Sequence, residues 1–287
     1  MEINHLLQKG VDLIKDRPYG NPVLEATLVL GELLNVDKTY IYTHGDTLVS
    51  ESIVDKFLEM MKRRAKGYPI QYIINRKEFM GLDFYVEEGV LIPRPDTEIL
   101  VEYVLDYIDK EYKDKPINIL DLGIGSGSIA LSLAYYNKNA TVYGVDINDV
   151  PLKVAHINRE RFKLDNVYLY KGDLFQGIEG LELEERIHII ASNPPYIPKK
   201  EIEILQEEVK GYEPVDALDG GEDGLIFYKR IIPESNRYIK KKGLLIFEIG
   251  YDQGKDVENM MIKEGFKNIQ VLKDLQGLDR VVVGNKG

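Results

Sequence analysis

The chain has 287 residues, 44% of them hydrophobic, and its 37 basic residues against 48 acidic ones give a formal net charge of −11. This length favours one large domain with a smaller attachment. The negative charge argues against the broad basic surface that dominates nucleic-acid binding. The lack of cysteine excludes disulfides, thiolate metal sites and thiol nucleophiles, and the four histidines include no pair at helical spacing, so no metal site is expected.

The sequence also bears on location. No run of residues approaches the roughly 18 apolar residues of a membrane span, and the first residues, Met1 to His5, lack the basic and then apolar layout of a signal peptide. We therefore expect a cytoplasmic protein that binds no membrane. A monomer is also expected.

Residues 1–68 are predicted to form a small helical bundle. Apolar residues recur at helical spacing within residues 3–14, 23–34 and 53–61, with breaks at residues 18–22 and 43–46. Charges up to residue 78 sum to zero, so the net charge lies in the rest of the chain. Lys62, Arg63, Arg64 and Lys66 end the last helix, where they either complement the helix dipole in solvent or contact a partner.

Residues 69–92 are predicted to form a β-hairpin that links two domains. Residues 70–74 and 79–86 are rich in β-branched and aromatic side chains, and Asn75, Arg76 and Lys77 lie between them. The following segment leads into a helix through Tyr107, with Asp96 or Thr97 as its expected cap.

Residues 93–287 are predicted to form an α/β domain. The expected strands are residues 117–122, 141–146, 167–170, 187–191, 244–249, 268–272 and 280–283, and helical patterns separate the first six. This alternation is typical of a mostly parallel, Rossmann-like sheet with helices on both faces. Because only residues 273–279 join the last two strands, the final strand is expected to be antiparallel. The layout resembles that of the class I S-adenosylmethionine-dependent methyltransferases.

A glycine-rich loop, Asp121-Leu122-Gly123-Ile124-Gly125-Ser126-Gly127, follows the first strand of this domain and opens a helix. Glycines let such a loop turn tightly and let a ligand approach the backbone. Asp146 ends the second strand 25 residues after Asp121, where a carboxylate can accept hydrogen bonds from both ribose hydroxyls of a nucleotide. The alternatives are a tight turn without a ligand and an acid at a helix N-terminus.

Further positions complete the predicted site for S-adenosyl-L-methionine. Asp121 is placed to reach the amino group of the ligand or to order the loop, and Asp173 and Leu174 follow the third strand, where adenine would lie. Asp173 would accept from the exocyclic amine of adenine unless its segment is only a solvated loop. The expected cofactor-binding residues are Asp121, Gly123, Ile124, Gly125, Ser126, Gly127, Asp146, Ile147, Asp173, Leu174 and Asn193.

Asn193-Pro194-Pro195-Tyr196 directly follows the fourth strand of the domain, at the edge where open α/β sheets bind ligands. The Asn side chain carries one acceptor and two donors, the prolines leave carbonyls without competing N–H groups, and Tyr supplies a flat face. Together they can hold a planar amino group. The alternative is a plain strand-end turn, which Asn-Pro commonly opens.

The order of these segments resembles one family over essentially the whole chain: the peptide chain release factor glutamine methyltransferases, also called the HemK family. The Asn-Pro-Pro-Tyr element is shared with DNA adenine, ribosomal RNA guanine and other protein methyltransferases. Other segments indicate this family more specifically. They are residues 81–86, residues 90–98 with Ile-Pro-Arg-Pro, residues 212–214, residues 217–224 with Leu-Asp-Gly-Gly-Glu-Asp-Gly, residues 248–250 and residues 279–282.

The resemblance implies an enzyme that transfers the methyl group of S-adenosyl-L-methionine, leaving S-adenosyl-L-homocysteine, to the glutamine of the Gly-Gly-Gln motif in release factors. Asn193 and the Pro194 carbonyl would accept from the two N–H groups of the glutamine amide, and Tyr196 would pack on its plane, so Asn193, Pro194, Pro195 and Tyr196 are the expected catalytic and substrate-binding residues.

Four further positions bear on the resemblance. Arg94 and Glu98 are expected either to support the substrate loop or to form an intramolecular salt bridge. Leu174 replaces an aromatic residue and Ile124 a small or polar one of other members.

Two other functions remain open at the level of sequence. A nucleic-acid amino methyltransferase would use the same clamp on a flipped base, but the charge of −11 counts against it, so no direct nucleic-acid binding is expected. A non-catalytic cofactor-binding or ribosome-associated module would use the front bundle as an adaptor, and the intact Gly123, Asp146 and Asn193 count against that. The front bundle is expected to bind the release factor away from the glutamine.

Overall fold

The structure of the protein is a computed structural model that describes residues 1–287 and separates into two compact units. The first unit contains Met1–Arg76 and Gln206–Tyr212, and the second contains Lys77–Leu205 and Glu213–Gly287. The chain therefore leaves the first unit, contributes one short later segment to it, and then completes the second unit.

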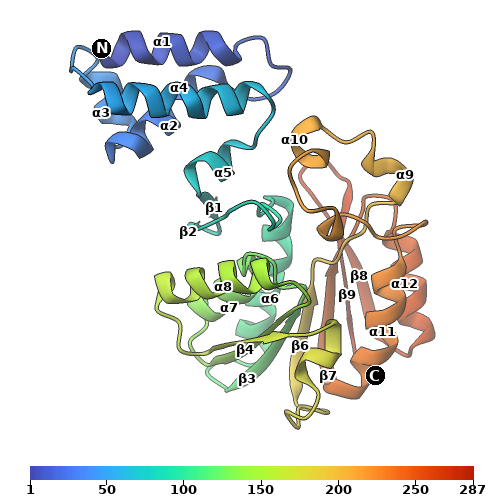
Figure 1. Ribbon diagram of the computed structural model, residues 1–287. Helices are drawn as coiled ribbons and strands as arrows, with labels where there is room; N and C mark the ends of the chain where they lie inside the picture. Colours follow the sequence, from blue (N-terminus) through green and yellow to red (C-terminus); the bar gives the residue numbers. More distant parts are fainter. The chain divides into compact units, whose positions relative to one another are not determined.

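The first unit is a helical bundle, as expected. Its helices are α1 (Ile3–Ile14), α2 (Pro22–Leu34), α3 (Lys38–Thr43), α4 (Glu51–Ala65), α5 (Ile70–Ile74) and α10 (Glu207–Lys210), and Figure 1 shows α1 alongside α4. Asn21 starts α2 by accepting from the N–H of Leu24, and Pro22 takes the first helical position, where its missing N–H costs nothing. A Cβ on Gly10 would lie 2.5 Å from the Phe57 ring, so α1 and α4 pack closely there.

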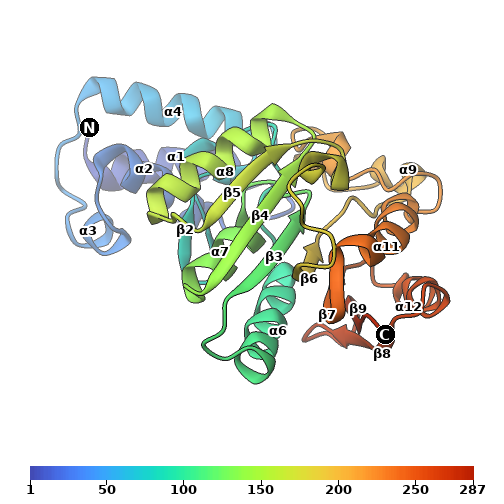
Figure 2. The same ribbon diagram turned by 90° about the horizontal axis from the view of Figure 1, so that it is seen from below.

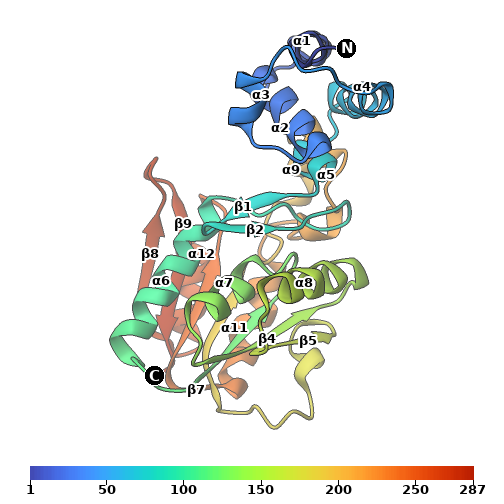
Figure 3. The same cartoon turned by 90° about the vertical axis from the view of Figure 1, so that its left-hand side faces the viewer.

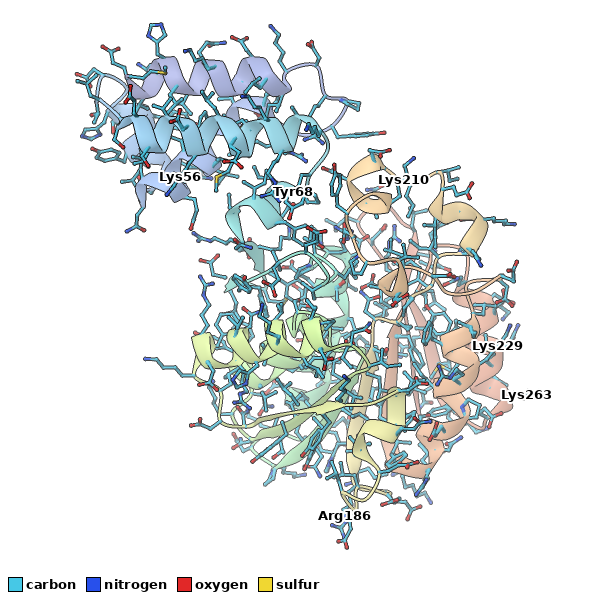
Figure 4. The ribbon with its side chains drawn as sticks, in the orientation of Figure 1. Lys56, Tyr68, Arg186, Lys210, Lys229 and Lys263 are labelled. Atoms are coloured by element: carbon cyan, nitrogen blue, oxygen red, sulfur yellow. The ribbon has the colours of Figure 1, made fainter.

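Within the basic cluster at the end of α4, Lys62, Arg63 and Lys66 are exposed, but Arg64 differs from both expectations. Arg64 is only 2% exposed, and its guanidinium donates to Glu25 and Glu208. Arg63 stacks over the ring of Tyr68, which is labelled in Figure 4, at 4.0 Å from the ring centroid. The chain turns back after α4, and this turn buries a side chain that helix periodicity alone places at a solvated end.

Residues 70–74 form the short helix α5, so the prediction of a strand there was wrong. Tyr72 and Ile73 are buried, and Asn75 ends the helix after one turn in the left-handed conformation. The hairpin instead consists of β1 (Lys77–Phe79) and β2 (Leu82–Phe84), joined by Met80 and Gly81, which both have positive φ, as a tight two-residue hairpin turn requires.

The second unit contains the seven expected strands. They are β3 (Ile117–Leu122), β4 (Ala140–Asp146), β5 (Val167–Lys171), β6 (Ile187–Ser192), β7 (Ile239–Glu248), β8 (Lys267–Lys273) and β9 (Asp279–Asn285). Their order is β5-β4-β3-β6-β7-β9-β8. Strand β9 is antiparallel to both of its neighbours, whereas the pairs from β5 to β7 are parallel, so the prediction for the last strand is confirmed.

Helices cover both faces of this sheet, as Figures 2 and 3 show. One apolar core joins the sheet to α6 (Asp96–Glu111), α7 (Ser128–Tyr136) and α8 (Asp149–Phe162), and the other joins it to α11 (Ile226–Tyr238) and α12 (Gly254–Lys263). Along β3, Ile117 and Ile119 point into the first core, and Leu120 and Leu122 into the second. The unit also contains α9 (Lys199–Ile202), η1 (Leu174–Ile178) and η2 (Val215–Ala217).

Strand β3 lies in the middle of the sheet between β4 and β6. The chain moves from β3 outward to β4 and β5, and then crosses back to β6 on the other side of β3. The loops after β3 and β6 therefore diverge at the carboxyl edge, which is where such sheets form a ligand crevice. None of the helices is both long and apolar enough to cross a membrane.

Candidate active site

A cavity of about 520 Å³ lies at the carboxyl edge of the sheet in the second unit. Its size is within the range of small-molecule sites. Residues from the loops after β3, β4, β5 and β6 line it, together with residues 89–97 and residues from 214 to 230. Of the expected site residues, the cavity brings together Gly123, Ile124, Gly125, Ser126, Asp146, Ile147, Asp173, Leu174, Asn193, Pro194 and Pro195, whereas Asp121, Gly127 and Tyr196 do not line it.

The three glycines of the loop after β3 have different environments. All have positive φ, but a Cβ on Gly123 or Gly125 would meet nothing within 4 Å, so their backbone faces open space. A Cβ on Gly127 would lie 2.6 Å from Leu131 of α7, so Gly127 serves helix packing instead. Ile124 packs against Gly144 of β4, where a Cβ would meet its side chain at 2.1 Å, which gives the bulky residue at this loop position a structural reason.

Asp146 connects two loops through its carboxylate. One oxygen accepts from the N–H of Gly125 at 3.1 Å and the other from the N–H of Asn148 at 3.0 Å. Burial raises the pKa of Asp146 above its ordinary value, although these two hydrogen bonds lower it. The carboxylate therefore shapes the glycine loop and also lines the cavity.

Asp121 lies behind the loop and is only 1% exposed. Its Oδ2 accepts from the N–H of Ala130 in the first turn of α7, while its Oδ1 has no hydrogen-bond partner. Burial, opposed by the Ala130 hydrogen bond, and the nearby Asp146 raise the pKa of Asp121 to about 8. Of the two roles considered from the sequence, its contacts are those of a residue that orders the loop.

The end of the cavity beyond β5 contains Asp173 and Leu174. Leu174 has a φ of 52°, which is uncommon for a residue with a branched side chain. Asp173 accepts from Arg230 of α11 at 2.6 Å, and Arg230 also lines the cavity. Arg230 could not be predicted from the sequence, because nothing in the pattern of a helix surface indicates that a residue contacts a loop 57 positions earlier.

Asn193, Pro194 and Pro195 line the cavity next to the glycine loop, but the hydroxyl of Tyr196 donates to Oε1 of Glu248 at 3.2 Å. Burial and the neighbouring Glu248 raise the pKa of Tyr196. The phenol is thus held by a buried carboxyl group at the end of β7.

Two residues that the sequence did not mark as functional connect to Asn193. Thr97 accepts from Nδ2 of Asn193 at 3.2 Å and donates to Oε2 of Glu248 at 2.5 Å. Thr97 is 2% exposed and Glu248 is 1% exposed. Burial raises the pKa of Glu248 to about 7, although the hydrogen bonds from Thr97 and Tyr196 lower it.

The predicted helix cap at Asp96 or Thr97 was wrong. Helix α6 begins at Asp96, its N-cap is Pro95, and no side chain accepts from the free N–H groups of its first turn. The buried carboxyl of Glu248 takes the Thr97 hydroxyl instead, and Asp96 pairs with Arg280 at 3.0 Å.

Arg94 forms an intramolecular salt bridge, which is one of the two outcomes expected for it. Its Nη2 lies 2.5 Å from Oε1 of Glu213, whose other oxygen accepts from the N–H of Ile92. Glu98 accepts from the N–H of Met80 at 2.6 Å. Arg94 itself lines the cavity, so this ion pair fixes part of its wall.

The residues of this cavity fit S-adenosyl-L-methionine. The backbone at Gly123 and Gly125 is open to a ligand, and an acidic side chain stands at the end of the neighbouring strand. A sheet of this order, with a glycine loop after β3, an acid after β4 and Asn-Pro-Pro-Tyr after β6, defines a class I S-adenosylmethionine-dependent methyltransferase.

Comparison with known proteins narrows this class. Residues 5–74 match a family model described as the PrmC N-terminal domain, and residues 113–273 match one described as a methyltransferase domain. The chain is 41% identical to the release factor glutamine methyltransferase of Clostridium acetobutylicum, over 100% of this chain and 99% of the relative. It is 40% identical to that of Clostridium botulinum over 100% of both chains. The chain belongs to the family of release factor glutamine methyltransferases.

The fold has relatives among solved structures as well. A methyltransferase from Pyrococcus furiosus aligns with a TM-score of 0.52 at 18% identity, covering 72% of this chain and 90% of that one. At this identity the likeness concerns the fold alone.

Proposed function

We propose that this chain methylates the side-chain amide nitrogen of the glutamine in the Gly-Gly-Gln motif of peptide chain release factors. The names of its relatives support the substrate. The observation that carries the proposal is the placement of Asn193 and Pro194 on the wall of the cavity beside the glycine loop. There a planar amide and a methyl donor can lie next to each other.

In this proposal, the ends of β3, β4 and β5 hold the cofactor. The backbone at Gly123 and Gly125 approaches it, Asp146 accepts from its ribose hydroxyls, and Asp173 and Leu174 lie against its adenine. S-adenosyl-L-methionine, when bound, supplies a methyl carbon on a positively charged sulfur, and the sulfur keeps the bonding electron pair when the methyl leaves. The exposed side chain of Ile147 lines the cavity at the start of the next loop, where it would lie against the ribose.

Asn193 and Pro194 orient the glutamine. A primary amide is a poor nucleophile, because its nitrogen lone pair is delocalised into the carbonyl group. The Oδ1 of Asn193 and the carbonyl of Pro194 accept from its two N–H groups and so point the nitrogen at the methyl carbon. Orientation of both reactants can lower the barrier by about 7–11 kcal/mol, and the same two acceptors stabilise positive charge that develops on the nitrogen.

No strong base is required in this mechanism. Once the nitrogen has gained the methyl carbon it is acidic, and it releases its extra proton to water. The buried carboxyl groups of Asp121 and Glu248 do not line the cavity. Neither is placed to take that proton directly.

The wider assignment is part of the same proposal. Residues 1–68 bind the body of the release factor, residues 69–92 form the linking segment, and residues 93–287 carry the methyl transfer. The chain acts as a cytosolic monomer, and it does not hold nucleic acid directly. The net charge of −11 supports the last point.

The proposal is tested by incubating the enzyme with labelled S-adenosyl-L-methionine, a release factor and RNA together. We expect one added methyl group on the Gly-Gly-Gln peptide, located by mass spectrometry. Label in the RNA alone would contradict the proposal and favour a base as substrate.

The clamp itself is tested with Asn193→Ala. We expect kcat to fall on the order of 10²-fold, while cofactor affinity changes only a few-fold, because the second acceptor bond exists only with glutamine bound. Asn139→Ala is the matched control, since Asn139 is exposed just before β4, at the amino edge of the sheet. Equal losses of turnover and cofactor affinity would show that Asn193 is not a substrate clamp.

A further inference from the structure

Glu248 lies at the centre of a buried hydrogen-bonded chain that ends at the cavity. Its Oε2 accepts from Thr97, its Oε1 accepts from Tyr196, and the Thr97 hydroxyl oxygen lies 3.2 Å from Nδ2 of Asn193. The residues come from the end of β7, the first turn of α6 and the loop after β6. Glu248 forms no ion pair, which leaves two hydroxyl groups as the partners of its carboxyl oxygens.

The hydrogens available in this hydrogen-bonded network determine the orientation of the Asn193 amide. A carboxylate can only accept hydrogen bonds, so the single hydrogen of the Thr97 hydroxyl must go to Glu248. Only a lone pair of Thr97 then faces Asn193, and a lone pair accepts only from the NH2 group. The amide oxygen of Asn193 must therefore point away from Thr97.

We propose that Glu248 is a positioning residue that sets the polarity of the Asn193 amide through Thr97, so that the site offers an acceptor and not a donor to the substrate. This inference rests on the proposed role of Asn193 as a clamp for the glutamine N–H. The same carboxylate holds Tyr196 by its hydroxyl. One buried group thereby orients both polar side chains of the Asn-Pro-Pro-Tyr segment.

Protonation of Glu248 reverses this arrangement. A neutral carboxyl group donates to Thr97, and the Thr97 hydrogen then turns toward Asn193. The amide must rotate to present its oxygen to Thr97, which leaves its NH2 group facing the N–H of the substrate. Two donors then face each other, and the glutamine amide loses its hydrogen-bonded position.

The charged groups around Glu248 keep both protonation states accessible. Burial raises the pKa of Glu248 to about 7; the hydrogen bonds from Thr97 and Tyr196 lower it, the Asp96 carboxylate raises it and Arg280 lowers it. The hydroxyl of Tyr228 donates to the backbone oxygen of Glu248, so the side-chain carboxyl of Glu248 is left to Thr97 and Tyr196. Turnover should consequently fall as the pH decreases through about 7.

The first test compares Glu248→Gln with the unaltered enzyme. The Gln side chain can donate to Thr97 and so permits the reversed amide. We expect kcat to fall on the order of 10²-fold, while KM for the release factor and cofactor affinity each change less than about threefold, which is the pattern of a lost transition-state interaction. Unchanged kcat in a folded Glu248→Gln enzyme would overturn the proposal.

The second test uses the pair Thr97→Val and Thr97→Ser, and stands even if Glu248→Gln does not fold. Thr97→Val removes the hydroxyl that links Glu248 to Asn193, so kcat should fall and lose the part of its pH dependence near 7. Thr97→Ser keeps the hydroxyl and should restore both. Asp121, whose pKa burial raises to about 8, has its hydrogen bond with Ala130 and none with Thr97, so its titration should be the same in all three enzymes, and differences between their pH profiles report Glu248.

The outcomes separate this inference from the proposed function. If Asn193→Ala retains full turnover, the clamp itself is absent. If Asn193→Ala loses turnover but Thr97→Val keeps the rate and pH profile of the unaltered enzyme, the clamp stands and the role of Glu248 is wrong.

Discussion

The two units each bury a carboxyl network, but the partners of the carboxyl groups differ. In the first unit, Arg64 donates to Glu25 at 2.6 and 2.8 Å and to Glu208 at 2.6 Å, and Arg17 lies 3.3 Å from Glu208. Two cations thus face two carboxylates. In the second unit, Glu248 has only hydroxyl partners.

Because of these different partners, Glu208 in the first unit stays ionised, whereas Glu248 in the second unit can change its protonation state. For Glu208, burial opposes ionisation, but the hydrogen bonds and charges of Arg64 and Arg17 together lower its pKa. For Glu248, burial prevails and raises the pKa to about 7. The half-buried Glu208, paired with cations, keeps its charge at neutral pH, whereas the fully buried Glu248, paired with hydroxyls, titrates there.

The largest expected effect comes from breaking the charged network. Arg64→Met leaves Glu25 and Glu208 without their main cation, so we expect the free energy of unfolding of the first unit to fall by about 3–5 kcal/mol. Urea unfolding measures this, with the exposed Lys62→Met in the same helix as control. A loss no larger than that of the control would show that the buried network contributes nothing to stability.

The pH dependence of stability should have opposite signs in the two networks. The raised pKa of Glu248 means that its contribution is fully present below the ordinary value of 4.5 and is lost as the pH rises through about 7. The lowered pKa of Glu208 means that its contribution is present above 4.5 and is lost as the pH falls through the folded-state value.

Denaturant unfolding from pH 3 to 8 checks this contrast. Relative to the unaltered protein, Glu248→Gln should gain stability as the pH rises from 5 to 8, by an amount on the order of 3 kcal/mol. Glu208→Gln should be less stable than the unaltered protein above pH 4.5, and this deficit should shrink as the pH falls below 4.5. A deficit of Glu208→Gln that stays constant down to pH 3, or a stability difference of Glu248→Gln that does not change from pH 5 to 8, would contradict the contrast.

The smallest expected effect concerns an exposed ion pair. Lys171 lies 2.7 Å from Asp149, and their side chains are 56% and 81% exposed. Solvent screens such a pair, so Lys171→Ala should change the free energy of unfolding by less than about 1 kcal/mol, and added salt should remove even that. A loss comparable to that of Arg64→Met would mean that burial does not set the strength of these pairs.

The sequence predicted those parts of the fold and site that depend on local pattern. The alternation of strand segments with helical patterns located all seven strands of the main sheet, and the position of Gly123, Asp146 and Asn193 at the ends of three of them implied that they meet at one edge. The cavity contains all three. A strand end fixes the position of the next residue, and this part of a site can therefore be predicted from sequence.

What the sequence did not predict depends on contacts between distant positions. Thr97 and Glu248 are 151 residues apart, and each has an ordinary local explanation, as a helix cap and as a strand terminus. Residues 70–74 have β-branched composition, yet burial against the bundle makes them a helix. Asp121 lies in the glycine motif but faces α7, and only the direction of its side chain distinguishes that role from ligand binding.

The segment Gln206–Tyr212 has a consequence for synthesis of the protein. It belongs to the first unit, where Glu208 accepts from Arg64 and the Tyr212 ring packs edge-on against Tyr68. On the ribosome this segment emerges roughly 130 residues after Arg76, many seconds later at ordinary elongation rates. Until then Arg64 has Glu25 as its carboxylate partner but lacks Glu208. The native stability of the bundle is therefore reached late, and an early nascent chain exposes a cationic site that only its own later residues fill.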